Sequence, residues 1–291
     1  MGEESDQSAG NWHPDFDSAW LKPTGHGGPV ILGANVKPPD HVWGSVILLG
    51  NFDGLHVGHK TLLAAARRQA ALLNAPLAIM SCEPHPKQFF NPGGTPFRLS
   101  SAVAKRELCA RLGIDLLFMP EFNASFAGLS ATDFVAEILV RQLGVRAVVV
   151  GQDFHFGKAR SGSVGDLKRL GELAPFQTVV VPDLIVKGQR ISSSTIRNWI
   201  AAGDLELVHQ SIGRDWMIQG QVTEAGSLAF DQNAVLPPPG PYTVDIWAMD
   251  GSLVANLSVV LHDDRSARCM DGDIVPANFL VSDWMSARIP S

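Results

Sequence analysis

The feature that most constrains the fold is a regular alternation of short apolar runs with longer segments rich in helix formers. Residues 46–49 read Val-Ile-Leu-Leu and are followed by a glycine, which is typical of a strand buried on both faces of a sheet. Residues 62–73 are rich in leucine, alanine and arginine and contain no glycine or proline, which predicts a helix. A strand, a glycine-rich turn and a helix in this order begin a βαβ unit.

The same alternation continues to residue 181. A cap at Ser130 or Thr132 is predicted to open one of the later helices. Strands that alternate with helices predict an α/β fold with a parallel sheet, whose ligands bind beyond the carboxyl ends of the strands. The further strands are predicted at residues 77–81, 114–119, 145–150 and 178–181, and the further helices at residues 103–112, 131–143 and 164–173.

The pattern changes near residue 213, after two more helical segments at residues 194–202 and 205–210. Alternating apolar residues then favour strands, and an Asp-Gly pair at 250–251 between two of them is a hairpin signal. A second domain is therefore predicted from about residue 213, as a small antiparallel β-barrel or sandwich. Its clearest strands are predicted at residues 217–222, 242–249 and 254–261.

Composition excludes several classes of partner and location. The chain of 291 residues has 23 Lys and Arg against 29 Asp and Glu, a net charge of −6, whereas binding to a nucleic-acid backbone needs a dense positive field. No apolar run approaches the ~18 residues of a membrane helix, and the polar, acidic start resembles no targeting signal. Cys82, Cys109 and Cys269 lack the spacing of a disulfide framework or a zinc cluster. We therefore expect a soluble cytoplasmic protein with no nucleic-acid or membrane partner.

The most informative segment is residues 50–60, Gly-Asn-Phe-Asp-Gly-Leu-His-Val-Gly-His-Lys, between the first predicted strand and its helix. Its glycines allow close backbone approach, and the helix N-terminus offers free N–H groups and a positive dipole end, which suit a phosphate. His56 and His59 share one face of the first helical turn and can donate hydrogen bonds to a phosphoryl group. The alternatives are a histidine pair satisfied at a helix cap, and a zinc site, which lacks the glutamate of H-E-x-x-H.

A second anion site is predicted at residues 190–197, Arg-Ile-Ser-Ser-Ser-Thr-Ile-Arg, where a helix begins after the last strand of the sheet. Its serines offer hydroxyls at a helix N-terminus, and Arg197 can hold phosphate oxygens in a forked geometry. The alternative is a serine-capped surface helix. We expect this segment and the histidine segment to converge on one triphosphate at the edge of the sheet.

Two further segments follow strands directly and are expected at the same edge. Residues 151–162 contain Asp153, which could bind a ribose or an exocyclic amine, and Phe154 and Phe156, which could contact a flat ring. Plain core packing is the alternative for both phenylalanines. The other segment, residues 82–86, reads Cys-Glu-Pro-His-Pro.

Taken in order, these four segments resemble the motifs of bacterial FAD synthetases of the HxGH nucleotidyltransferase superfamily. The matching family patterns are GNFDGxHxGH, FxPHP, VGxDFxFGxxxxG and ISSTxIR. This chain departs from them at Ser194, where threonine is usual, and at Cys82, where the family has an aromatic residue. The resemblance implies a Rossmann-like nucleotidyltransferase domain followed by a small antiparallel β-barrel.

The resemblance also implies roles for individual residues. His56, His59 and Arg197 are expected to be catalytic. The residues expected to bind ATP are Gly50, Asn51, Phe52, Asp53, Gly54, Asp153, Ser192, Ser193 and Ser194, and those expected to border the flavin are Pro84, His85, Pro86, Phe154 and Phe156.

The implied activity is transfer of AMP from ATP to FMN, which gives FAD and pyrophosphate. The FMN phosphate attacks the α-phosphorus in line and is already a dianion, so the protein supplies positioning and charge neutralisation and no general base. Mg²⁺ is expected to bind mainly through phosphate oxygens, with no metal site of the protein itself. The alternatives are a related transferase acting on another phosphate, a bifunctional riboflavin kinase/FAD synthetase, and a non-catalytic flavin- or nucleotide-binding regulator.

The C-terminal part resembles the riboflavin kinase barrel that follows in bifunctional FAD synthetases, but it lacks key residues. Gly213-Arg214 and residues 236–242, Leu-Pro-Pro-Pro-Gly-Pro-Tyr, are similar to that family's motifs. Residues 227–233 stand where the family has LGFPTAN, and only Asn233 of its metal-nucleotide pair is retained. The family's catalytic glutamate has no convincing counterpart.

Without the threonine hydroxyl and a general base, phosphoryl transfer loses most of the positioning that a protein supplies. We therefore predict a degenerate barrel without kinase activity. The predicted organisation is a loose extension at residues 1–40, an FMN adenylyltransferase-like domain at 41–212 and the degenerate barrel at 213–291.

Overall fold

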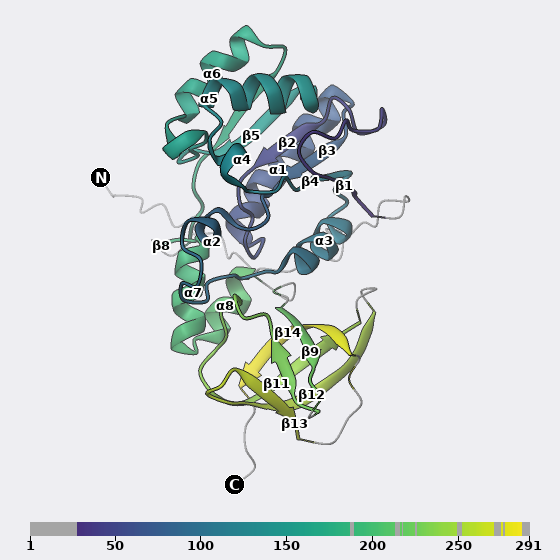
Figure 1. The fold of residues 1–291 in the computed structure, drawn as a ribbon, viewed down its shortest axis with the longest axis vertical. Coiled ribbons are helices and arrows are strands. Elements are labelled where there is room, and N and C mark those ends of the chain that lie inside the picture. The colour runs from purple at the N-terminus through teal and green to yellow at the C-terminus, as the bar shows by residue number, and fades with distance from the viewer. Residues whose placement is uncertain are drawn as a thin grey trace, which may run out of the picture.

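The structure is a computed structural model that describes residues 28–186, 189–212, 216, 218–224, 226–248, 252–270, 275 and 277–286. Its N-terminal part is an α/β domain built on one parallel sheet of six strands, in the order β1-β4-β3-β2-β5-β6 (Figure 1). The predicted parallel sheet is confirmed. The strands are β1 Val30–Leu32, β2 Val46–Leu49, β3 Leu77–Met80, β4 Leu116–Phe118, β5 Ala147–Gly151 and β6 Gln177–Val181.

Helices cover both faces of this sheet, which explains why its central strands are apolar throughout. In β2, Val46 and Leu48 pack against α1 and α3, whereas Ile47 and Leu49 pack against η2 and α6 on the other face. Ser130 caps the short α5, as one of the two predicted caps, and the chain continues as the π-helix η2. The helical elements are α1 Val57–Leu73, α2 Pro86–Phe90, α3 Ala102–Arg111, α4 Ala124–Ala127, α5 Ala131–Asp133, η2 Phe134–Gln142, η3 Lys158–Arg160, α6 Val164–Leu173, α7 Ser193–Ala202 and α8 Leu205–Ile212.

The order of the strands places a switch point beside β2. From β2 the chain moves outward through β3 to β4, and it then returns to β5 on the opposite side of β2. Because the connections run in opposite directions here, the loops after β2 and β5 leave a crevice at the carboxyl edge of the sheet.

The C-terminal part is a closed antiparallel barrel in the order β10-β13-β12-β11-β14-β9, so of the two predicted possibilities the barrel is the one observed. β11 and β12 pair as the predicted hairpin, with Gly240 opposite Leu261, while the turn residues 249–251 lie outside the described residues. Gly213 and Arg214 also lie outside them. The strands are β9 Ile218–Val222, β10 Leu228–Phe230, β11 Gly240–Trp247, β12 Leu253–Leu261, β13 Ser266–Cys269 and β14 Asn278–Ser286, and a separate pair is formed by β7 Ile185–Val186 and β8 Gln189–Arg190.

The two parts share a hydrophobic core. Figure 1 shows α7 and α8 between the sheet and the barrel, and Ile196 and Val208 of these helices belong to one buried cluster with Val244 and Phe279 of the barrel. The cluster also includes Leu99, from the loop between α2 and α3. The barrel therefore packs directly on the segments that lead to the pocket.

The edge strand β1 differs from the sequence expectation. Residues 1–40 were expected to be a loose extension, but Val30–Leu32 form the edge strand β1, with Val30 opposite Leu116 of β4. A strand of three residues is too short to show a recognisable period, which is why the pattern missed it. Residues 1–27 lie outside the described residues.

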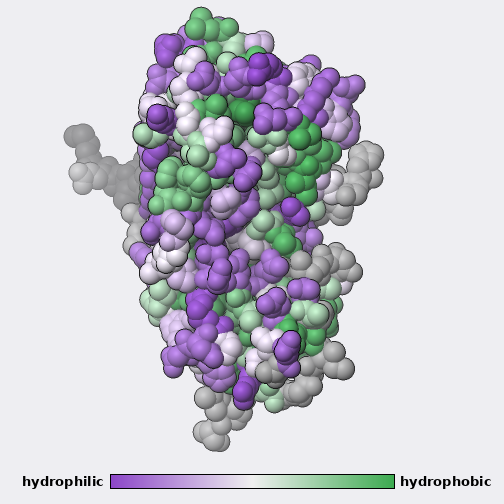
Figure 2. Space-filling model, in the orientation of Figure 1, coloured by the Kyte–Doolittle hydropathy of each residue, from purple (hydrophilic) through white to green (hydrophobic). Residues whose placement is uncertain are grey.

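Hydrophobic side chains of the described residues lie on the surface as well as in the core. None of their helices combines the length and the hydrophobicity that crossing a membrane requires. On the face shown in Figure 2, hydrophobic residues form small groups separated by hydrophilic ones. Scattered apolar residues of this kind are ordinary on a folded protein.

Candidate active site

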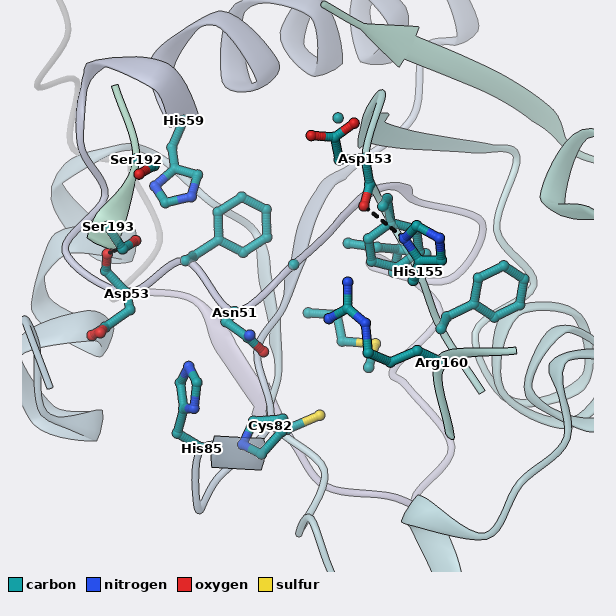
Figure 3. A pocket seen from close by; sticks show the side chains of 18 of the residues that line it. Asn51, Asp53, His59, Cys82, His85, Asp153, His155, Arg160, Ser192 and Ser193 are labelled. Carbon is teal, nitrogen blue, oxygen red and sulfur yellow. Dashed lines mark hydrogen bonds between the residues drawn. The ribbon is translucent and has the colours of Figure 1, made fainter. Parts of the chain in front are cut away.

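A pocket of about 790 Å³ lies at the carboxyl edge of the sheet, between the loops after β2 and β5 and the start of α7 (Figure 3). Its volume is within the usual range for small-molecule sites. All the residues predicted for the site line this pocket except Gly54 and Pro84. Gly54 is buried behind the turn, where its N–H donates to the hydroxyl of Ser100. Pro84 follows a cis peptide bond after Glu83 and lies outside the lining.

The two histidines of the turn are stacked on each other at the N-terminus of α1. The ring centroids of His56 and His59 are 3.8 Å apart with an interplanar angle of 22°, and the ring of Phe52 lies 5.0 Å from that of His59. His56 is the N-cap residue, but its side chain makes no capping bond. The Nδ1 atoms of both rings are buried and have no hydrogen-bond partner among the described residues. The alternative of a histidine pair satisfied at a cap is therefore not what the structure shows.

Both imidazoles are neutral at pH 7. Burial, reinforced by the neighbouring His59, lowers the pKa of His56 well below its usual value. Burial and the ammonium of Lys105 lower the pKa of His59 to about 3. Each neutral ring carries one N–H, so the pair can donate hydrogen bonds without adding a permanent charge.

Asp53 and Arg197 form a buried ion pair that joins the two predicted anion-binding segments. The carboxylate of Asp53 lies 2.7 Å from Nη2 of Arg197 and also accepts the backbone N–H groups of Leu99 and Ser100 at 3.0–3.1 Å. Burial raises the pKa of Asp53, but Arg197 and Lys105 outweigh it and hold the pKa below the usual value. Nε of Arg197 donates to the carbonyl oxygen of Phe97 at 2.5 Å. Asp53 and Arg197 were expected to act on the nucleotide, but many of their hydrogen bonds are made within the protein.

The three serines differ in what they have left to offer a ligand. The hydroxyl of Ser192 accepts the N–H of Thr195 at 3.2 Å and caps α7, while the hydroxyl of Ser193 donates to the carbonyl oxygen of Asp53 at 3.0 Å. Ser194 is exposed, lines the pocket, and has a hydroxyl that no contact of the described residues engages. The Ser193–Asp53 bond brings the two segments into direct contact, as their predicted convergence requires.

The opposite part of the pocket is aromatic. The rings of Phe154 and Phe156 are stacked, with centroids 5.8 Å apart, and Phe156 also packs on Phe134 within the core. Phe156 thus packs in the core, which was the alternative to ligand contact predicted for it. The half-buried Phe154 has more of its ring exposed for contact with a ligand. Further aromatic residues on this wall are Phe90, Phe122 and Phe126.

His85 is held in one orientation at the N-terminus of α2. Its Nδ1 accepts the N–H of Lys87 at 3.0 Å, and burial lowers its pKa to about 4. The neutral ring therefore carries its proton on Nε2. Figure 3 shows the ring pointing into the pocket, so Nε2–H is a donor toward a ligand, and Pro86 lines the wall beside it.

Asp153 lies at the rim of the pocket in an exposed ion pair. Its carboxylate is 2.5 Å from Nη1 of Arg190, whose other terminal nitrogen is 3.0 Å from Asp183. The pair links the loop after β5 to the segment that leads into α7. Arg190 had no predicted role of its own, because nothing in its spacing relates it to Asp153.

A buried lysine lies beneath the glycine-rich turn and was also missed. The side chain of Lys105 is fully buried, and its ammonium donates to the carbonyl oxygen of Asn51 at 3.1 Å and to the hydroxyl of Ser81. Ser81 donates to the same carbonyl at 2.8 Å. Burial lowers the pKa of Lys105. The available clue was a lysine on the same helical face as Cys109, which is buried.

The fold and the pocket together define a nucleotide-binding α/β domain. Its pocket at a sheet switch point brings together a glycine-rich turn, neutral imidazole donors and a second helix N-terminus, which is an arrangement suited to phosphates.

Comparison with known proteins identifies the family more narrowly. Residues 39–195 match the FAD synthetase family. The chain is 37% identical over 201 residues to a bifunctional riboflavin kinase/FMN adenylyltransferase of Pseudomonas fluorescens, a match that covers 69% of this chain and 64% of that relative. It is 31% identical over 216 residues to the Escherichia coli (strain K12) protein of the same description, covering 71% and 69%. The chain belongs to the FAD synthetase family.

Two features of these matches bear on function. The chain spans less than two thirds of the length of the Pseudomonas relative. The structure is also similar to the crystal structure of a macrolide-efflux protein from Streptococcus pneumoniae, with a TM-score of 0.71 and coverage of 89% and 98% of the two chains. At 22% sequence identity this likeness shows a shared fold only.

Proposed function

We propose that this protein is an FMN adenylyltransferase that transfers AMP from ATP to FMN and releases pyrophosphate. The observation that carries the proposal is the contact between the two anion-binding segments: Ser193 binds the carbonyl of Asp53, and Arg197 pairs with its carboxylate. One triphosphate can therefore reach both segments. The family match and the names of the relatives support the same reaction.

The geometry suggests how the reaction is divided among the residues. The N–H groups of His56 and His59 would bind the α-phosphate and the bridging oxygen. The N-terminus of α7, the hydroxyl of Ser194 and the pocket side of Arg197 would hold the departing pyrophosphate. Neutral donors suit this task because they stabilise charge as it develops and need no proton transfer.

Mg²⁺ enters this scheme as part of the MgATP substrate. Among the described residues, no group of three or more His, Cys, Asp or Glu side chains lies close enough to bind a metal. An ion held mainly by phosphate oxygens fits these surroundings, and it would neutralise part of the triphosphate charge. Because the cysteines show no pairing motif, we also propose that the enzyme works in the reducing cytoplasm.

The test is a direct assay with FMN and ATP labelled at the α-phosphate. Labelled FAD and free pyrophosphate are expected from the wild type, and His59→Ala is expected to reduce turnover about 10²- to 10³-fold while the fold is retained. His41→Ala, at an exposed position, is the matched control. Binding of FMN and ATP without FAD would instead support a non-catalytic regulator, and a higher rate with a different phosphorylated acceptor would support the related transferase.

We further propose that the barrel lacks riboflavin kinase activity. Besides the missing threonine and glutamate, the surroundings of Asn233 support this. Its N–H donates to Asp231 at 2.8 Å, and its carbonyl oxygen accepts the N–H groups of Phe97 and Arg98 at 2.9 and 2.8 Å. The loop that would bind the nucleotide of a kinase is thus bonded to the other domain. Formation of FMN from riboflavin and ATP would show instead that the protein is bifunctional.

A further inference from the structure

The pocket contains one cationic side chain whose charged group makes no contact with another group of the described residues. Arg190 pairs with Asp153 and Asp183, and Arg197 pairs with Asp53. The ammonium of a third lining cation, Lys87, lies over the ring of Phe97 at 4.7 Å. Arg160 is the fourth, and no hydrogen bond, ion pair or ring contact engages its guanidinium within the part of the chain that the structure describes.

The backbone around Arg160 is held in an uncommon conformation. Ala159 and Arg160 have φ angles of 52° and 59°, in the left-handed region that costs a non-glycine residue free energy. Such strain persists only where the surroundings fix the chain, and here they do. Phe156 and Gly162 exchange two backbone hydrogen bonds at 3.0 and 2.9 Å across the loop.

A further contact fixes this loop against the start of α5. A Cβ atom at Gly157 would lie 2.8 Å from the backbone nitrogen of Ala131, so only glycine fits there. The N–H of Lys158 donates to the carbonyl oxygen of Leu129 at 2.7 Å. The loop is thus fixed on both sides, and Figure 3 shows the guanidinium of Arg160 directed toward the middle of the pocket.

The position of Arg160 indicates which anion it meets. In Figure 3, His59, Ser192 and Ser193 lie on one side of the pocket and Arg160 on the other, on the loop that also carries Asp153 and His155. Phe154 and Phe156, which form the aromatic wall, belong to the same loop. A ligand that stacks a flat ring on this wall and carries a phosphate toward the histidines passes Arg160.

Charge balance points the same way. The attacking phosphate monoester is an anion that must approach a triphosphate, which is unfavourable unless a cation compensates. Both imidazoles are neutral, and the charges of Arg190 and Arg197 are offset by carboxylates. The ammonium of Lys87 also has no carboxylate partner among the described residues, but it lies over the ring of Phe97. The guanidinium of Arg160, which no other described group engages, is therefore the cation placed to compensate the second anion, and its planar fork matches phosphate oxygens.

We infer that Arg160 binds the phosphate monoester of the adenylyl acceptor and selects phosphorylated flavin over unphosphorylated flavin. The inference rests on the proposed function, because it takes the second substrate of the pocket to be FMN. It assigns Arg160 to substrate selection and leaves the triphosphate of ATP to the histidine and serine segments on the other side of the pocket.

The test compares Arg160→Gln with Lys158→Gln, which removes an exposed charge from the same loop but outside the lining of the pocket. Dissociation constants for FMN and for riboflavin are measured by flavin fluorescence without ATP, and KM values are measured for FMN and ATP. Arg160→Gln is expected to weaken FMN binding roughly ten- to a hundredfold, the size expected for a lost charge-assisted hydrogen bond. Riboflavin binding and the KM for ATP should stay within about twofold of the wild type, and Lys158→Gln should change none of these.

Several results would overturn the inference. Equal weakening of FMN and riboflavin would mean that Arg160 contacts the ring or shapes the loop, and a raised KM for ATP alone would assign it to the nucleotide. Wild-type protein that binds FMN no more tightly than riboflavin would also refute it. Arg160→Lys should restore part of the FMN preference. Because binding is measured without ATP, failure to form FAD would refute the proposed function separately from the role of Arg160.

Discussion

At the scale of single residues, the pocket is built from polar side chains that are buried and given partners inside the protein. Asp53 is the clearest case: it is only 2% exposed and accepts hydrogen bonds from two backbone N–H groups and from Arg197. The hydrogen bonds of such a side chain are made mainly within the protein, although the residue lines the pocket. Substitutions at residues of this kind should change folding stability together with activity.

Replacement of Asp53 by asparagine should strongly destabilise the fold. The neutral amide would leave the guanidinium of Arg197 without its counter-ion and place an NH₂ group against N–H donors, so we expect a loss of about 3–5 kcal/mol in the free energy of unfolding. Urea denaturation measures the change. Asp153→Asn is the control, because it removes an exposed aspartate–arginine pair and should cost less than about 1 kcal/mol. Similar losses in the two variants would contradict the structural role of the buried pair.

The buried histidines should make stability depend on pH in a definite direction. The pKa of His59 is about 3 in the folded protein, whereas an unfolded chain binds a proton near pH 6.5. Between these values the unfolded state holds the extra proton, so stability falls as the pH falls below 6.5, by up to about 1.4 kcal/mol per pH unit for one such group.

His59→Gln should remove one proton's share of this pH dependence. Unfolding free energies measured from pH 7 to about pH 4.5, within the window between the two pKa values, should fall less steeply in this variant than in the wild type. His41→Gln, at an exposed position, serves as the control for the loss of a histidine elsewhere in the protein. A slope unchanged by His59→Gln would show that this imidazole is protonated in the folded state.

The residues that face the ligand were easier to predict than those that support them. His56, His59 and the serines stand in dense local motifs, and the structure brings them to one pocket. Lys105 and Arg98 were missed because their partners are distant in the sequence: Lys105 binds the carbonyl of Asn51, and Arg98 forms a two-bond ion pair with Glu83. A bond to a backbone carbonyl depends on no residue type at the partner position, so no motif records it.

At the scale of helices and strands, most elements that begin with a capping residue or contain a long apolar run could be predicted from the local sequence. The helix α6, Val164–Leu173, was predicted with the observed bounds, and in the structure Ser163 caps it. The short strands β1, β10 and β13 were not predicted, since three or four residues show no period and their pairing depends on distant neighbours. The π-helical winding of η2 likewise has no signature in its apolar pattern.

The capping box of α6 offers a test at this scale. The hydroxyl of Ser163 accepts the N–H of Asp166 at 3.3 Å, and the carboxylate of Asp166 accepts the N–H of Ser163 at 3.1 Å. Ser163→Ala should lower the free energy of unfolding by about 1 kcal/mol, measured by urea denaturation. Ser163→Asp retains a capping oxygen and should recover most of the loss. If alanine and aspartate behaved alike, the cap would contribute little to the stability of α6.

At the scale of the whole molecule, the two parts of the chain are tied together at several points. The indole N–H of Trp216 donates to the carbonyl oxygen of Leu99 at 2.8 Å, and the N–H of Val235 donates to that of Arg98 at 2.9 Å. The shared core adds apolar contact between α7, α8 and the barrel. We still propose a domain boundary near residue 213, but the packing of the two parts is continuous across it. The sequence predicted both folds and could not predict this contact, which depends on backbone groups.

We therefore expect the described parts to unfold in one transition. Calorimetry should give a single peak, and tryptophan fluorescence and far-ultraviolet circular dichroism should report the same midpoint, since a shared core couples the parts. Trp216→Phe, which leaves the carbonyl of Leu99 without this donor, should lower that midpoint while keeping one transition. Two separate peaks in the wild type would show that the barrel unfolds independently.

The segment at residues 97–100 is held from both sides, by Asp53 and Arg197 on one and by the loop at Asn233 on the other. A change that loosens the barrel at this contact should therefore also shift the carboxylate of Asp53, which belongs to the glycine-rich turn of the pocket. Substitutions in this part of the barrel are consequently expected to impair the pocket of the other domain, even though the barrel itself is proposed to catalyse no reaction.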